Sequence, residues 1–224
     1  MKSQKPKAKS QLQIKVCGLT QQSQIQELIS LNVDFLGFIF YEKSPRYVLH
    51  HLSLKEIAEI PHFGKVGVFV NESIKAIVEI TTESQLDIIQ LHGNENEKFI
   101  LQLKQILGNN IKIIKVIRIG NQSFDELQKT INQQPSTVNY LLFDTDSKAF
   151  GGTGKTFDWQ ILNEIEIPKP YFLSGGISLE NIHQLSTINH QPLAIDINSK
   201  FEIEPGNKNL EKIKKFTQIV NKIY

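Results

Sequence analysis

Short apolar segments and amphipathic segments alternate eight times along this chain. The apolar segments are almost continuous and rich in Val, Ile and Phe, which is typical of strands buried on both faces of a parallel sheet. The predicted strands are 12–17, 34–40, 65–70, 86–91, 111–119, 139–144, 171–174 and 194–197. The predicted helices are 23–31, 54–60, 73–82, 95–107, 123–133, 158–164, 179–186 and 209–222, with Ser73, Ser123 and Ser178 marking helix starts.

Eight strand–helix units predict a single (βα)₈ TIM barrel, because closing a parallel sheet of eight strands removes its edges. The length of 224 residues falls at the compact end of the range for this fold. An open, doubly wound sheet is the alternative that the same alternation allows. We expect one catalytic domain over residues 11–224 and a short, disordered, basic tail over residues 1–10.

Charge is distributed unevenly between the tail and the rest of the chain. Residues 1–10 hold four lysines and no acid, which leaves 21 basic and 23 acidic residues elsewhere. This balance argues against a nucleic-acid partner.

No apolar run approaches the roughly 18 residues of a membrane span, and no secretory signal is evident. With a single cysteine we expect a cytoplasmic compartment, and the sequence leaves monomer and homodimer open.

Polar residues at strand ends are the candidate functional residues, because TIM barrels carry their active sites at the C-terminal ends of the strands. The lone Cys17 follows the first predicted strand and cannot form an internal disulfide, although small buried filler remains the alternative. The other strand ends contribute Arg46, Asn71, Gln90, His92, Arg118, Asp144, Asp196, Asn198 and Ser199. This set lacks a Cys/His cluster with zinc spacing, so we expect no metal.

Two glycine-containing segments suggest a phosphate site. Gly175 and Gly176 follow the seventh strand, and Asn198 and Ser199 follow the eighth, where this fold usually binds phosphate. The alternative is that the paired glycines only turn the chain. Residues 151–156 fit only the end of a nucleotide P-loop, so we reject ATP or GTP binding. We expect a glycine lid there, with Gly152 and Gly154 near the phosphate and Lys155 as an optional counter-charge.

Several motifs together resemble the phosphoribosylanthranilate isomerase family, in order and spacing from about residue 14 onward. They are Lys15-Val16-Cys17-Gly18-Leu19-Thr20, Gly37-Phe38-Ile39-Phe40, Ser44-Pro45-Arg46-Tyr47-Val48, Gln90-Leu91-His92-Gly93, Leu142-Phe143-Asp144, residues 151–159, Ser174-Gly175-Gly176-Ile177 and the Asp196 segment. One position departs from the family pattern, because Lys200 stands where the family usually has glycine. The resemblance implies a (βα)₈ barrel, in agreement with the count of strands and helices.

The resemblance further implies an Amadori rearrangement of a phosphosugar–anthranilate substrate in tryptophan biosynthesis, without cofactor. Asp144 matches the general acid, which requires desolvation in an apolar site, and Cys17 matches the general base, which requires local positive potential from Lys15 or Arg46. Arg46 is expected to grip the anthranilate carboxylate.

Four further candidates have roles that the sequence leaves open. Lys15, Gln90, His92 and Asp196 are candidate substrate-binding residues, although His92 also fits a core histidine and Asp196 a structural role. Arg118 either faces the pocket or caps its strand. Another phosphosugar isomerase or epimerase, and a catalytically inactive binding barrel, are the rival functions.

Overall fold

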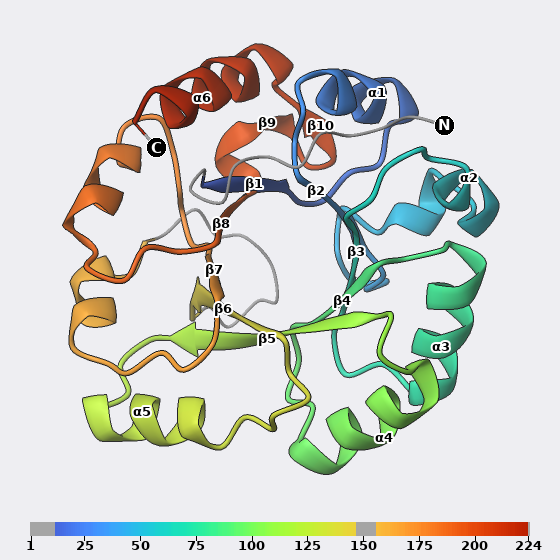
Figure 1. Ribbon diagram of the computed structural model, residues 1–224. Helices are drawn as coiled ribbons and strands as arrows, with labels where there is room; N and C mark the ends of the chain where they lie inside the picture. Colours follow the sequence, from blue (N-terminus) through green and yellow to red (C-terminus); the bar gives the residue numbers. More distant parts are fainter. Residues whose placement is uncertain (1–11, 147–155, 224) are drawn as a thin grey trace.

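The computed structural model describes residues 12–146 and 156–223, and its central feature is a closed barrel of eight parallel strands. The strands are β1 (Gln13–Val16), β2 (Phe35–Ile39), β3 (Lys65–Phe69), β4 (Ile88–Leu91), β5 (Lys112–Ile119), β6 (Tyr140–Thr145), β7 (Tyr171–Leu173) and β8 (Ala194–Ile197). Each strand pairs with the next, and β8 pairs with β1 to close the ring (Figure 1). The predicted TIM barrel is therefore confirmed, and the open-sheet alternative is wrong. The predicted tail, residues 1–10, lies outside the described residues.

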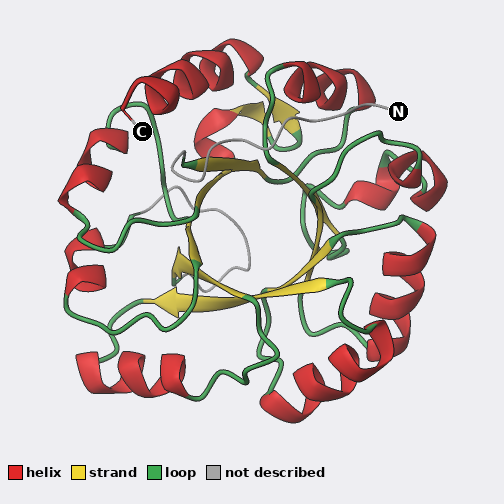
Figure 2. Ribbon diagram, in the orientation of Figure 1, coloured by secondary structure: helices red, strands yellow, loops and turns green. Residues whose placement is uncertain are grey.

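Helices surround the ring of strands, as Figure 2 shows in red around yellow. The α-helices are α1 (Gln22–Ser30), α2 (Leu54–Ala58), α3 (Ile74–Glu83), α4 (Glu97–Leu107), α5 (Phe124–Asn132) and α6 (Leu210–Ile223). Ser73 and Ser123 cap α3 and α5 as predicted, each accepting a hydrogen bond from a backbone N–H of the first turn. Among the described helices, none is long and apolar enough to cross a membrane.

The predicted helices 158–164 and 179–186 are wrong in type, because short 3₁₀ helices occupy these places, at Trp159–Asn163 and Ile182–Thr187. Ser178 does not start a helix, since the 3₁₀ helix begins four residues later. The second 3₁₀ helix ends in Ser186 and Thr187, residue types that form helices poorly, and short helical pieces are often 3₁₀.

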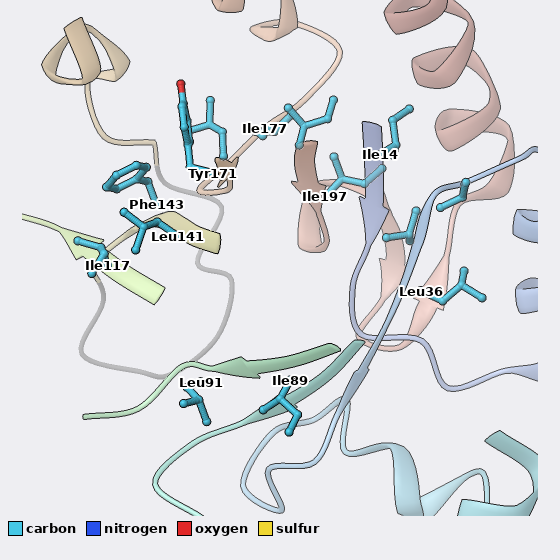
Figure 3. Close-up of a cluster of buried hydrophobic side chains, with 14 of the residues drawn as sticks. Ile14, Leu36, Ile89, Leu91, Ile117, Leu141, Phe143, Tyr171, Ile177 and Ile197 are labelled. Atoms are coloured by element: carbon cyan, nitrogen blue, oxygen red, sulfur yellow. The ribbon is translucent and has the colours of Figure 1, made fainter. Parts of the chain in front are cut away.

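Two hydrophobic layers hold the barrel together. The larger lies between strands and helices, and Figure 3 shows part of it, including Ile14, Leu36, Ile89, Leu91, Phe143 and Tyr171. The smaller cluster comprises Val66, Ile88, Ile114, Val116, Leu142, Phe172 and Ala194. Side chains two residues apart on a strand point to the same face of the sheet. Gln90 therefore lies on the same face as Ile88, and Asp196 on the same face as Ala194, each nearer the C-terminal end of its strand. The apolar cluster therefore supports a polar layer at the end where we expect the site.

A small antiparallel hairpin follows β8, which the sequence had suggested only as a loop. It consists of β9 (Glu202–Glu204) and β10 (Asn207–Lys208), joined by the turn residues Pro205 and Gly206. The carbonyl of Gly206 accepts a hydrogen bond from the Thr20 hydroxyl at 2.8 Å. Figure 1 shows the hairpin beside β1, between α1 and α6. This anchoring brings residues from beyond the eighth strand close to the end of the first.

Candidate active site

One pocket lies at the C-terminal ends of the strands and gathers most of the predicted site residues. Its lining includes Cys17, Ser44, Arg46, Gln90, His92, Asp144, Gly175, Gly176, Asp196, Asn198, Ser199 and Lys200. These residues come from loops or strand ends after six of the eight strands, and the barrel is what brings them together. The thiol and the carboxyl predicted to act as base and acid therefore line the same pocket.

Cys17 lies next to a buried ion pair formed across the seam where the barrel closes. The Lys15 ammonium is 2.8 Å from Asp196 Oδ2, and Lys15 and Asp196 are paired in register between β1 and β8. Lys15 is fully buried, and its charge also acts on the Cys17 thiol, so both side chains lie on the same side of the strand. Asp196 Oδ1 is buried and has no hydrogen-bond partner among the described residues, so one oxygen is left for a ligand.

Burial and the Lys15 charge act on Cys17 in opposite directions. Burial raises the pKa of the thiol, and the nearby Lys15 ammonium opposes this only in part. Lys15 therefore supplies the expected positive charge, but this charge does not bring the net pKa of the thiol below its ordinary value. Burial also raises the pKa of Asp196 in spite of Lys15. For Lys15, burial lowers the pKa, but Asp196 and Cys17 outweigh it, so the net direction is upward and the ammonium is retained.

The expected role of Asp144 as an acid required an apolar environment, but polar groups contact its carboxyl. It is half-buried, its Oδ1 accepts a hydrogen bond from the Thr145 N–H at 2.9 Å, and its Oδ2 is 3.4 Å from His92 Nε2. Gln90 Nε2 is in turn 3.2 Å from His92 Nδ1. Because an amide N–H₂ can only donate, this contact favours the tautomer in which Nδ1 accepts and Nε2 carries the proton, toward Asp144. His92 thus lines the pocket beside Asp144 and is not a core histidine.

Arg46 lines the pocket, but part of its guanidinium is already engaged. Its Nε and Nη2 contact the Glu202 carboxylate of β9 at 2.9 Å and 2.6 Å. The Lys208 ammonium of β10 lies 2.7 Å from the same carboxylate and 2.9 Å from Asn198 Oδ1. Burial raises the pKa of Glu202, but Arg46 and Lys208 outweigh it and the net direction is downward. Burial lowers the pKa of Lys208, and Glu202 opposes this.

Sequence reasoning missed Glu202 and Lys208, because both lie beyond the last predicted strand. The one available signal was the Pro205-Gly206 dipeptide, which favours a turn and so predicts a hairpin that returns to the strand ends. Arg118 was among the candidates, but it does not line this pocket; its guanidinium donates to the His92 carbonyl.

Gly175 and Gly176 are explained partly by local structure and partly by backbone N–H groups that are left for a ligand. Gly175 has φ of +86°, and a Cβ there would lie 2.4 Å from Thr145 Oγ1, so only glycine fits. The N–H groups of Gly175, Gly176 and Ile177 donate to no acceptor within residues 12–146 and 156–223. Ser199 starts a 3₁₀ helix at Ser199–Phe201 on the same pocket. Gly152 and Gly154 lie outside the described residues.

Within residues 12–146 and 156–223, no three His, Cys, Asp or Glu side chains are grouped so that they could hold a metal ion. The titratable side chains of the pocket instead contact one another in pairs, Lys15 with Asp196 and His92 with Asp144. The arrangement therefore offers proton donors and acceptors together with hydrogen-bond donors for anions.

Comparison with known proteins gives the same family at the level of sequence and structure. A sequence model described as N-(5'-phosphoribosyl)anthranilate (PRA) isomerase matches residues 14–219. The chain is 38% identical over 208 residues to N-(5'-phosphoribosyl)anthranilate isomerase of Parabacteroides distasonis, covering 92% of this chain and 91% of that protein.

Solved structures agree with the sequence match. Phosphoribosyl anthranilate isomerase from Thermotoga maritima superimposes with a TM-score of 0.76 at 30% identity, covering 94% of this chain and 99% of the other. A phosphoribosyl anthranilate isomerase in complex with reduced 1-(o-carboxyphenylamino)-1-deoxyribulose 5-phosphate superimposes with a TM-score of 0.74 at 26% identity, with the same coverage. The chain belongs to the phosphoribosylanthranilate isomerase family.

Proposed function

We propose that this enzyme converts N-(5-phosphoribosyl)anthranilate to 1-(2-carboxyphenylamino)-1-deoxyribulose 5-phosphate, a step of tryptophan biosynthesis, with Cys17 as general base and Asp144 as general acid. Family membership supports the reaction. The observation that carries the residue roles is that the thiol and the carboxyl, 127 positions apart in the sequence, line one pocket with an arginine and a pair of glycines.

The reaction needs two proton transfers on the sugar. Asp144 donates a proton to the furanose oxygen, the bond from C1′ to that oxygen breaks, and the nitrogen lone pair forms an iminium. The Cys17 thiolate then removes the C2′ proton, and its electron pair forms the double bond of an enolamine. That species takes a proton at C1′ and loses one from the C2′ hydroxyl to give the ketone. Each transfer requires a group within hydrogen-bond reach of the proton that moves.

The other pocket residues bind and orient the substrate in this proposal. The open N–H groups at Gly175 and Gly176, with Asn198 and Ser199 across the pocket, bind the phosphate. The N–H group of His92 Nε2 donates to Asp144 and holds its carboxyl toward the sugar. Asp196 Oδ1 and Gln90 Oε1, both buried without a partner among the described residues, accept hydrogen bonds from substrate donors such as ribose hydroxyls or the bridging N–H.

Arg46 retains one edge for the anthranilate carboxylate. Glu202 occupies the edge formed by Nε and Nη2, while a guanidinium offers a second edge between its two terminal nitrogens. Lys200 lines the same pocket as the glycine pair and adds positive charge to the phosphate end. We also place the enzyme in the cytoplasm.

The direct test is the activity of the purified protein and of two variants. We expect the protein to consume the fluorescent anthranilate adduct, and Cys17→Ala and Asp144→Ala each to lower kcat by roughly 10²–10⁴-fold, the usual contribution of a general acid or base. Ser136→Ala is the control, because Ser136 is exposed and remote from the pocket lining. Turnover of another phosphosugar but not of the adduct would refute the proposed reaction, and near-normal activity of either variant would remove that residue from the mechanism.

A further inference from the structure

We propose that Glu202 and Lys208 are positioning residues for substrate selection: they hold the Arg46 guanidinium so that its free edge and an unneutralised positive charge face the substrate carboxylate. The inference rests on the proposed function of Arg46 and extends it to two residues of the β9–β10 hairpin. Neither residue is among those that line the pocket; Glu202 contacts Arg46 directly, and Lys208 contacts Glu202 and the pocket residue Asn198.

The orientation of the Arg46 guanidinium is set by its contact with Glu202. At the tip, Glu202 accepts from Nε at 2.9 Å and from Nη2 at 2.6 Å, a two-point contact that defines the plane of the guanidinium. Arg46 Cδ packs closely against Gly18, where an added Cβ would lie only 2.7 Å from it. Nη1 donates to no acceptor within the described parts of the chain, and Arg46 lines the pocket. The edge that remains is therefore directed by Glu202.

The charge balance of the cluster favours an anionic ligand. Glu202 contributes one negative charge and is shared by two cations, Arg46 and Lys208, at 2.6 Å and 2.7 Å. Lys208 is 1% exposed, so bulk solvent cannot screen this excess efficiently. Without Lys208, Glu202 would neutralise Arg46 alone, and the guanidinium would attract a second carboxylate less strongly. Lys208 thus keeps Arg46 available for a second anion.

The backbone of Lys208 is held by contacts with α1 that do not involve Arg46. Its backbone N–H donates to Gln24 Oε1 at 2.8 Å, and its carbonyl accepts from Gln24 Nε2 at 3.0 Å, which ties β10 to α1. Its ammonium also donates to Asn198 Oδ1, and Asn198 lines the pocket. Because these contacts do not depend on Arg46, Lys208 is already in place before a ligand binds.

Two matched ligands separate recognition of the carboxylate from recognition of the rest of the substrate. The first is reduced 1-(o-carboxyphenylamino)-1-deoxyribulose 5-phosphate, and the second is the same compound with hydrogen in place of the carboxyl group. Titration calorimetry on the full chain gives both dissociation constants without catalysis. We expect the wild type to prefer the carboxylate ligand at least tenfold, because this preference corresponds to only about 1.4 kcal/mol, less than a hydrogen bond to a charged group usually contributes.

Lys208→Gln is the decisive variant, because it removes the charge and keeps a hydrogen-bond donor. We expect it to weaken binding of the carboxylate ligand by roughly tenfold and to leave the carboxyl-free ligand within about twofold of wild type. Lys208→Arg restores the charge and is expected to recover part of the preference. Lys214→Gln, an exposed lysine of α6, is the control and is expected to match the wild type.

Other outcomes decide against one proposal or the other. The positioning role is overturned if Lys208→Gln weakens the binding of both ligands equally. It is also overturned if Lys208→Gln keeps the preference for the carboxylate ligand while Arg46→Gln loses it. In both cases the role of Arg46 stands. If the wild type shows no preference, the assigned role of Arg46 fails; if it binds neither ligand, the substrate assignment fails. Should Lys208→Gln not fold, the Glu202→Gln/Lys208→Gln double variant removes the pair together. Loss of the preference there supports the proposal, and its retention overturns it.

Discussion

Two opposing effects act on the Cys17 thiol. The barrel buries the side chain to 5% exposure, and this burial raises the pKa of the thiol. The Lys15 ammonium, two positions earlier on the same side of the strand, favours the thiolate and lowers that pKa. Burial outweighs the charge, so the net direction of the pKa is upward.

This balance predicts how the ionisation of Cys17 depends on pH. Because the pKa of the Cys17 thiol is raised, the thiolate fraction is small at neutral pH and grows as the pH increases. We expect the thiolate absorbance of this single cysteine to keep rising above the ordinary thiol pKa of about 8.5. The measurement is a pH titration of that absorbance, because the proposed reaction also needs protonated Asp144 and kcat/KM does not report the thiol alone. Cys17→Ser is expected to lose this rise, and a plateau reached below about pH 7.5 would contradict a raised pKa.

Arg46 illustrates a limit of sequence-based prediction at the residue scale. Its two-point contact with the anthranilate carboxylate stays a prediction, and in the structure the guanidinium makes such a contact with Glu202 of the chain itself. Residues 46 and 202 are 156 positions apart. No local pattern joins them, because their contact depends on a hairpin folding back over the end of β1.

At the level of elements, patterns of apolar residues located the strands and the long helices well. The signals failed where segments were short. Residues 158–164 and 179–186 form 3₁₀ helices, and the β9–β10 hairpin has only two or three residues in each strand. Segments of this length hold too few residues for a period to be measured. The missed hairpin matters most, since it supplies Glu202 and Lys208.

The helix starts give a prediction about stability. Ser123 caps α5 in a reciprocal arrangement, in which its hydroxyl accepts from the Glu126 N–H at 3.3 Å and the Glu126 carboxylate accepts from the Ser123 N–H at 2.8 Å. Ser123→Ala leaves a helix N–H without this acceptor, so we expect a loss of about 1 kcal/mol in the free energy of unfolding. Urea unfolding measures it. Ser136→Ala, at an exposed site outside any helix, is the control, and an equal loss in both variants would contradict the capping role.

At the scale of the whole molecule, the site exists because the barrel closes. Lys15 and Asp196 are 181 positions apart, yet they lie side by side at the seam between β1 and β8. The count of eight strands was enough to predict that the first and last would meet. It could not predict the ion pair, since the register between β1 and β8 follows from the stagger of the closed ring.

Variants of Lys15 and Asp196 show whether this ion pair stabilises the fold or supports the reaction. Lys15→Met leaves the Asp196 carboxylate buried without its partner, and we expect a loss of roughly 3–5 kcal/mol in the free energy of unfolding. The Lys15→Met/Asp196→Leu double variant removes both charges in favour of apolar groups and is expected to return to within about 1 kcal/mol of wild type in urea unfolding. Its kcat is expected to stay low, because the thiol has lost the Lys15 ammonium that favours its ionised form. A double variant no more stable than Lys15→Met would show that the seam needs the charges themselves, and a fully active one would confine the pair to a structural role.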